Sequence, residues 1–243
     1  STLISAEINS SEIPDHAFDG CSKLTSLTLG NSVIAIGAAA FSGLDALEEL
    51  VIPSSVTRLG SSSFTGVASL KKLIIPDSVT VLGSSAFSGA SKLESLTLGN
   101  GITSLENYVF KGSGSLSSVV IPESVIAIGY EAFKDSGLTS LIIPNSVQVV
   151  GDRAFAGVPI TALTLGASLA AWNNTTNDND AFYGICDTLN TLNVDSSAIP
   201  SHAFDGCLEL TSLTFGLGVQ SIGDYSFNQI GVVTGLIIPE SIT

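Results

Sequence analysis

Apolar and polar residues follow one pattern along this chain, and the pattern restarts about every 23 residues. It reads F-x-x-x-x-x-L-x-x-L-x-[LI]-[PG]-x-S-V-x-x-[IL]-G-x-x-A, and the segments that begin at Phe41 and Phe110 are two clear copies. Ten phenylalanines start a copy: Phe18, Phe41, Phe64, Phe87, Phe110, Phe133, Phe155, Phe182, Phe204 and Phe227. Ten occurrences at nearly constant spacing indicate an internal repeat.

Each repeat predicts one β-strand and then a turn. Leu73 and Ile75 are two residues apart, which is the spacing of side chains on one face of a strand. In five repeats a proline follows and ends the strand, because proline cannot donate the next ladder hydrogen bond. A second apolar pair, such as Val79 and Leu82, returns the chain inward. We expect a tight turn at the glycine after that pair, which is Gly37, Gly60, Gly83, Gly129, Gly151 and Gly223.

One repeat has too few inward side chains for a core of its own, whereas stacked repeats share a continuous core, as in a solenoid. The residue before each phenylalanine is always Ala, Ser or Val, so we expect it to be buried against the neighbouring coil. The residue two positions before phenylalanine varies from His16 to Glu131, so we expect it to face solvent. Ten coils spaced about 4.8 Å apart predict a rod or shallow arc roughly 50 Å long.

The repeat resembles the BspA-type leucine-rich repeat, whose 23-residue pattern carries the signature A-F-x-x-C-x-x-L-x-x-[IL]-x-[IL]-P. AFDGCSKLTSLTL from Ala17 and AFDGCLELTSLTF from Ala203 match it closely, although other repeats lack the cysteine. The resemblance covers the chain except for a gap at 166–186. It implies an α/β repeat solenoid that is mostly β, with one parallel strand per coil and loops or short helical turns opposite.

A longer period lies over the short one. Residues 2–41 and 188–227 are identical at 22 of 40 aligned positions, which places near-copies 186 residues apart. We therefore expect residues 1–243 to form a single solenoid of about ten coils, cut from a longer tandem array of 186-residue blocks. The segment 166–186 is an irregular insertion in this array.

The charge balance excludes several partners. The chain carries 22 acidic and 8 basic residues and a net charge of −14. Nucleic acids and anionic membranes are therefore not expected partners, since both bind through lysine and arginine. No apolar run is long enough to span a bilayer, and no signal-peptide pattern stands at the start.

The insertion contains the candidate metal and modification sites. Asp178 and Asp180 lie in an Asn/Asp-rich stretch and are candidate calcium ligands, the one cofactor hypothesis for this chain. The alternative is a solvated loop, because Asn and Asp favour turns. Trp172 stands where other repeats place Ile or Leu, so we expect it in the core. Glycosylation sequons begin at Asn173 and Asn174 within the insertion, and a third begins at Asn9 outside it.

The cysteines and histidines do not predict catalysis. His16 and His202 each precede a cysteine by five residues, a spacing that raises the possibility of a nucleophile with its base. However, each histidine falls at the variable outward position and each cysteine at an inward one. Cys21 and Cys207 are too many coils apart for a disulfide, whereas Cys186 and Cys207 lie on adjacent coils. We expect buried free thiols and no enzymatic activity.

The outward residue of each strand forms a column, which we call the strand-face strip. Nine of its ten members are β-branched, which is typical of strands in general and also makes an exposed apolar surface. A repetitive ligand such as ice or a polysaccharide prefers an unbroken threonine column, which this Thr-Val-Ile rhythm does not provide. The strip comprises Thr28, Val51, Ile74, Thr97, Val120, Ile142, Thr164, Asn193, Thr214 and Ile237.

Two functions remain. The resemblance implies an extracellular or cell-surface protein, since several members of the family are adhesins that bind matrix proteins or partner cells. The first hypothesis is a non-enzymatic interaction or adhesion module that binds a protein partner through the strand-face strip. The second is a structural protein whose copies build an extracellular filament or coat by tandem or end-to-end assembly.

Overall fold

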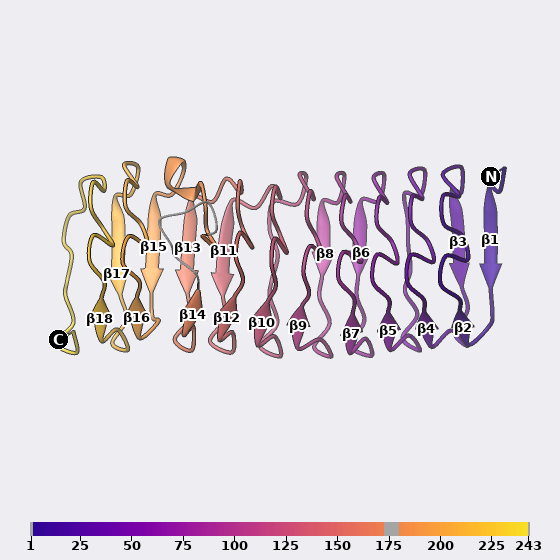
Figure 1. The fold of residues 1–243 in the computed structure, drawn as a ribbon, viewed down its shortest axis with the longest axis horizontal. Helices are drawn as coiled ribbons and strands as arrows, with labels where there is room; N and C mark the ends of the chain where they lie inside the picture. The colour runs from indigo at the N-terminus through magenta and orange to yellow at the C-terminus, as the bar shows by residue number, and fades with distance from the viewer. Residues whose placement is uncertain (1, 173–179, 243) are drawn as a thin grey trace.

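The computed structural model describes residues 2–172 and 180–242. In this part of the chain, parallel strands wind into a solenoid of about nine turns. The coils lie side by side along an extended rod, and the two termini are at opposite ends (Figure 1). A typical coil contains a first strand, a reversal, a second short strand that runs the other way, and a return through turns (Figure 1).

The first strands form a row along one face of the rod. Their residues alternate between exposed and buried, and neighbours pair one repeat apart, as Leu141 does with Leu163. Three parallel sheets result, β1-β3, β6-β8 and β11-β13-β15-β17. The strands are β1 (Ser5–Ile8), β3 (Ser26–Leu29), β6 (Lys72–Ile74), β8 (Ser95–Thr97), β11 (Ser140–Ile143), β13 (Ala162–Leu165), β15 (Thr191–Val194) and β17 (Ser212–Phe215).

A second row of strands corrects the expectation of one strand per coil. The second apolar pair of the repeat forms two-residue strands whose inward residue, such as Ile36 or Leu59, is buried. They form the parallel sheets β2-β4-β5-β7, β9-β10-β12-β14 and β16-β18. The strands are β2 (Glu12–Ile13), β4 (Ala35–Ile36), β5 (Arg58–Leu59), β7 (Val81–Leu82), β9 (Ser104–Leu105), β10 (Ala127–Ile128), β12 (Val149–Val150), β14 (Ala171–Trp172), β16 (Ala198–Ile199) and β18 (Ser221–Ile222).

The side opposite the strands consists of turns. The described residues contain no α-helix, so the helical part of the expected α/β class is not found in them. One three-residue 3-10 helix, η1 (Ile185–Asp187), is the helical element of this side. The expected loops are present instead, and they carry a regular hydrogen-bond pattern of their own.

On this turn side the main chain makes a third run of hydrogen bonds between coils. The N–H groups of Ser62, Phe64 and Gly66 each donate to a carbonyl of the next coil at 2.8 Å. Ser62 and Gly66 adopt the left-handed conformation, with φ of 56° and 78°. The same arrangement recurs around the phenylalanines of seven other repeats, Phe18, Phe41, Phe87, Phe110, Phe133, Phe155 and Phe204.

This run changes the environment of the variable residue two positions before phenylalanine. That residue is half-buried in most repeats, exposed at His16 and Tyr225, and buried at Glu131. The expectation that this residue faces solvent is therefore wrong for Glu131. The residue just before phenylalanine is buried as expected in nine repeats, and Ala17 in the first described coil is exposed.

The glycine after the second strand has a different role from the expected one. Gly60, Gly83 and Gly223 do not have positive φ, so their backbone conformation does not require glycine. They lie so close to the preceding coil that a Cβ atom at Gly83 would be 2.4 Å from the backbone nitrogen of Ser61. Glycine is needed here because the two coils touch main chain to main chain.

A stack of aromatic rings runs through the core. Consecutive phenylalanine rings from Phe18 to Phe182 are 5.1 to 6.0 Å apart and nearly parallel. Trp172 lies between the rings of Phe182 and Phe204, at 5.8 and 5.7 Å. Its expected place in the core is confirmed, and it continues the stack across the irregular segment.

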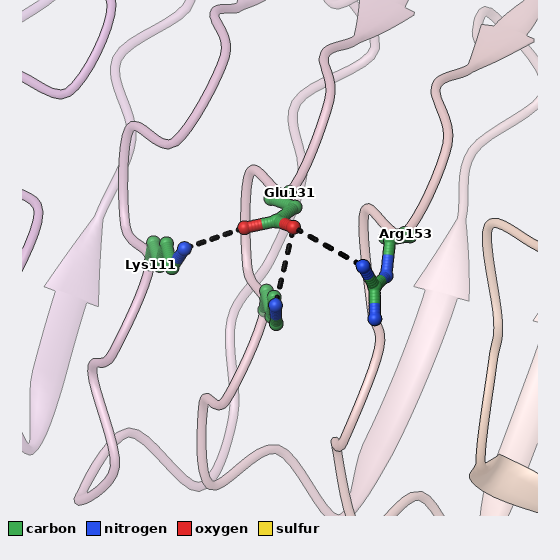
Figure 2. Close-up of polar contacts among 4 residues, drawn as sticks. Lys111, Glu131 and Arg153 are labelled. Carbon is green, nitrogen blue, oxygen red and sulfur yellow. Dashed lines mark hydrogen bonds and ion pairs between the residues drawn. The ribbon is translucent and has the colours of Figure 1, made fainter. Parts of the chain in front are cut away.

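Glu131 joins three coils through charged contacts (Figure 2). Its side chain is only 5% exposed, and its carboxylate pairs with Lys111 at 2.5 Å and Lys134 at 3.1 Å. Arg153 of the following coil lies 4.0 Å away. Burial alone raises the pKa of Glu131, but hydrogen bonds from Lys111, Lys134 and Tyr130 outweigh it and hold the pKa at about 2.

We predict that Gly83→Ala destabilises the protein by about 1–3 kcal/mol, because the new methyl group overpacks the contact with Ser61. Gly114→Ala is the matched control, since no atom lies within 4 Å of the place its Cβ would take and its φ is not positive. That control should be neutral or stabilising by about 0.5 kcal/mol. Urea unfolding measures both, and equal stabilities would contradict the close-contact role of Gly83.

We predict that Glu131→Gln lowers the free energy of unfolding at neutral pH by about 2 kcal/mol, the range for hydrogen bonds to charged groups. The pKa of Glu131 is lower in the folded state, so its stabilisation is present above pH 4.5 and disappears as pH falls toward 2. Urea titrations of wild type and variant should therefore converge between these pH values.

Glu48→Gln is the control for this measurement. Glu48 pairs with Lys71 at 2.9 Å, but both side chains are more than half exposed. Surface pairs of this kind contribute little to stability, because water and salt screen the two charges. A loss at Glu131 no larger than at Glu48, or one that does not depend on pH, would show that the three-coil contact is not stabilising.

Candidate protein-binding face

The strand-face strip lies on the outer side of the first row of strands. Each member stands between two inward residues of its coil, so strand alternation directs it outward. Val51, Val120 and Ile142 are 77%, 83% and 66% exposed. Eight of the ten members are exposed, and Thr164 and Asn193 are half-buried. The outward orientation agrees with the sequence-based expectation.

Part of the strip is a polar ladder. Thr164, Asn193 and Thr214 pair across β13, β15 and β17. Thr214 donates its hydroxyl to Oδ1 of Asn193 at 2.8 Å, and Asn193 donates its Nδ2 to Oγ1 of Thr164 at 3.3 Å. These side chains satisfy one another, so this end of the strip offers fewer free polar groups than its composition suggests.

Two coils interrupt the first row of strands, and both carry valine in the strip. Residues 117–121, between β8 and β11, form no strand, which is visible as a gap in the row of arrows (Figure 1). Residues 50–52, between β3 and β6, also form none, and Glu49 makes only an isolated bridge to Lys72. Val51 and Val120 are three repeats apart in the same Thr-Val-Ile rhythm.

A shallow groove lies at each interruption. The larger groove has a volume of about 720 Å³ and extends over four coils, with Val120 and Ile142 among its walls and Glu94 and Glu123 at its margins. A smaller groove of about 320 Å³ lies around Val51. Sequence reasoning did not predict these grooves, although the Thr-Val-Ile rhythm marks both positions.

The two grooves differ in charge. At the smaller groove, the lining contains one acid, Glu49, and one base, Lys72, and the adjacent Glu48 and Lys71 form an ion pair. At the larger groove, the two charged residues of the lining, Glu94 and Glu123, are both acidic. The first-strand segments of the coils from residue 93 onward, with the loops that follow them, contain acidic residues but no lysine or arginine.

The remaining candidate sites are not assembled by the described residues. Asp180 belongs to no metal cluster among them: its Oδ1 accepts the N–H of Phe182 at 2.9 Å, and burial raises its pKa to about 6. The part of the chain that the structure describes contains no group of three or more His, Cys, Asp or Glu side chains suited to a metal ion. Asp178, Asn173 and Asn174 lie outside the described residues, and Asn9 is exposed.

The cysteine prediction needs correction. Cys186 and Cys207 form a disulfide between adjacent coils, with Cα atoms 4.2 Å apart, and Cys21 is buried and free. The expectation of free thiols therefore holds for Cys21 alone.

The two histidines contact aspartates instead of cysteines: Nδ1 of His16 and of His202 each lies 3.1 Å from a carboxylate oxygen three residues later.

No helix among the described residues is long and apolar enough to cross a membrane. No curated protein sequence matches the chain. A leucine-rich repeat protein from Bacteroides ovatus ATCC 8483 has a similar structure, with a TM-score of 0.67 and 24% identity over 99% of this chain and 74% of that one. A leucine rich cell surface protein from Faecalibacterium prausnitzii A2-165 gives a TM-score of 0.51 and 21% identity, over 96% of this chain and 79% of that one.

The sequence itself matches a known repeat family. Six copies of the BspA type leucine rich repeat region match residues 11–139, 103–197 and 175–243. These ranges cover nearly the whole chain, and the repeat expected from its phenylalanine spacing is the same one. The chain belongs to the BspA-type leucine-rich repeat family.

Proposed function

We propose that this chain is a non-enzymatic module that binds a partner protein through the strand-face strip. The observation that carries the proposal is the exposed row of β-branched side chains from Val51 to Ile142 on an otherwise weakly charged face. An exposed apolar surface of this kind is typical of interaction sites. Repeat solenoids in general use such extended faces for binding.

We place this module outside the cell or on its surface. The Cys186–Cys207 disulfide supports this, because disulfides persist in oxidising compartments. The structurally similar protein from Faecalibacterium prausnitzii is described as a cell surface protein. Adhesion to another cell or to matrix is the form of binding that suits this location.

A second function is favoured by the 186-residue period. Near-identical segments at 2–41 and 188–227 are what a structural array of tandem blocks would contain. In this alternative, copies of the protein build an extracellular filament or coat. The net charge of −14 opposes such self-association, whereas it does not oppose binding of a different protein.

We predict that binding to partners found on an array of purified extracellular proteins depends on the strip. Ile142→Glu should weaken binding more than about tenfold, because it buries a charge in an apolar contact. Leu208→Glu is the matched control, since Leu208 is 67% exposed and lies on the turn side. Binding that Leu208→Glu removes and Ile142→Glu spares would contradict the proposal.

We predict that the protein sediments as a monomer and forms no filaments under the electron microscope. The structural alternative predicts filaments with an axial repeat near 38 Å, which is about eight coils at 4.8 Å each. Observation of that repeat in material from the native source would replace the binding proposal with the structural one.

A further inference from the structure

The larger groove indicates more specifically which kind of partner binds the strand-face strip. This inference rests on the proposed function, since it uses the same face. We propose that the groove over Val120 binds an extended polypeptide segment in which an apolar side chain is flanked by lysine or arginine.

The size of the groove favours an extended segment. Its lining comes from four successive coils, at Leu96, Val120, Ile142 and Thr164. Four coils at about 4.8 Å per step span about 14 Å along the rod. An extended chain rises about 3.3 Å per residue, so about four of its residues cover this length.

The walls of the groove favour an apolar side chain at its centre. Val120 and Ile142 are more than half exposed although both are large and apolar. Val119, which holds an inward position in its coil, is only partly buried. A bound apolar side chain would remove all three from water, which is the dominant favourable term in association.

The margins of the groove favour basic flanking residues. Glu123 is exposed and has no hydrogen bond or ion pair among the described residues. Glu94 lies within the electrostatic influence of Lys71, on the side toward the smaller groove. Because these acids are not matched by a base within the groove, a cationic segment is attracted and an acidic one is repelled.

The smaller groove around Val51 is a natural control within the same chain. It has the same interrupted strand and an equally exposed valine. Its charged lining residues are balanced, because it holds one base, Lys72, beside one acid, Glu49. A cationic segment should therefore prefer the groove at Val120 to the groove at Val51.

The test is selection of a random peptide library displayed on phage against the folded protein. We expect enriched peptides to carry Val, Ile or Leu next to Lys or Arg. Synthetic copies of the enriched peptides should bind about tenfold more weakly to the Glu123→Lys variant of the protein. They should bind several-fold more weakly to the Val120→Ser variant, or to the unchanged protein in added salt. Val51→Ser and Glu49→Gln should leave the affinity unchanged. All four variants alter surface positions, and thermal unfolding by circular dichroism confirms that they fold.

Each other outcome is informative. No enrichment, or peptides without an excess of basic residues, overturns the inference. Affinity lost with Val51→Ser but not with Val120→Ser overturns it too and leaves binding by the strand face intact. Peptides that bind equally to every strand-face variant, Ile142→Glu included, overturn both the inference and the proposed function.

Discussion

Main-chain hydrogen bonding between successive coils at constant register is the constraint on which this structure depends. Most coils meet the next through two strand ladders and through the third run on the turn side, as at Ser62, Phe64 and Gly66. This register is kept even where the repeat length changes, since Leu141 pairs with Leu163 and Leu163 with Leu192. The ring stack and the glycine contacts both follow, because equal coil spacing places equivalent residues directly over one another.

The same constraint explains why non-glycine residues tolerate a left-handed backbone. Ser85, Tyr108 and Arg153 all have φ near 60°, a conformation that costs roughly 1–2 kcal/mol for a residue with a side chain. Each of them donates its N–H to the next coil, so the strained conformation is fixed by a hydrogen bond that a relaxed one would break. Variable side chains are acceptable at this position because the backbone makes the contact.

The sequence was sufficient where one residue type holds one position in every repeat. The phenylalanine spacing predicted the solenoid, strand alternation predicted the outward strip, and the repeat position that Ile or Leu holds elsewhere predicted the buried place of Trp172. It was insufficient where the contact lies between main chains, as with the second row of strands and the close approach at Gly83. It also failed where residues of different coils meet, as in the three-coil contact of Glu131 and the Cys186–Cys207 disulfide.

A framework that repeats every 23 residues cannot by itself distinguish one partner from another, because every coil offers the same main-chain geometry. Specificity must come from positions where the chain departs from its own repeat. The strip departs at Val51 and Val120, where the strand ladder is interrupted, and the charges differ between these two places. Of these two, the groove near Glu123 is the one where an apolar surface and unbalanced acidic charge coincide. The interrupted strands alone would give two candidate sites on this face, and the difference in charge favours one of them.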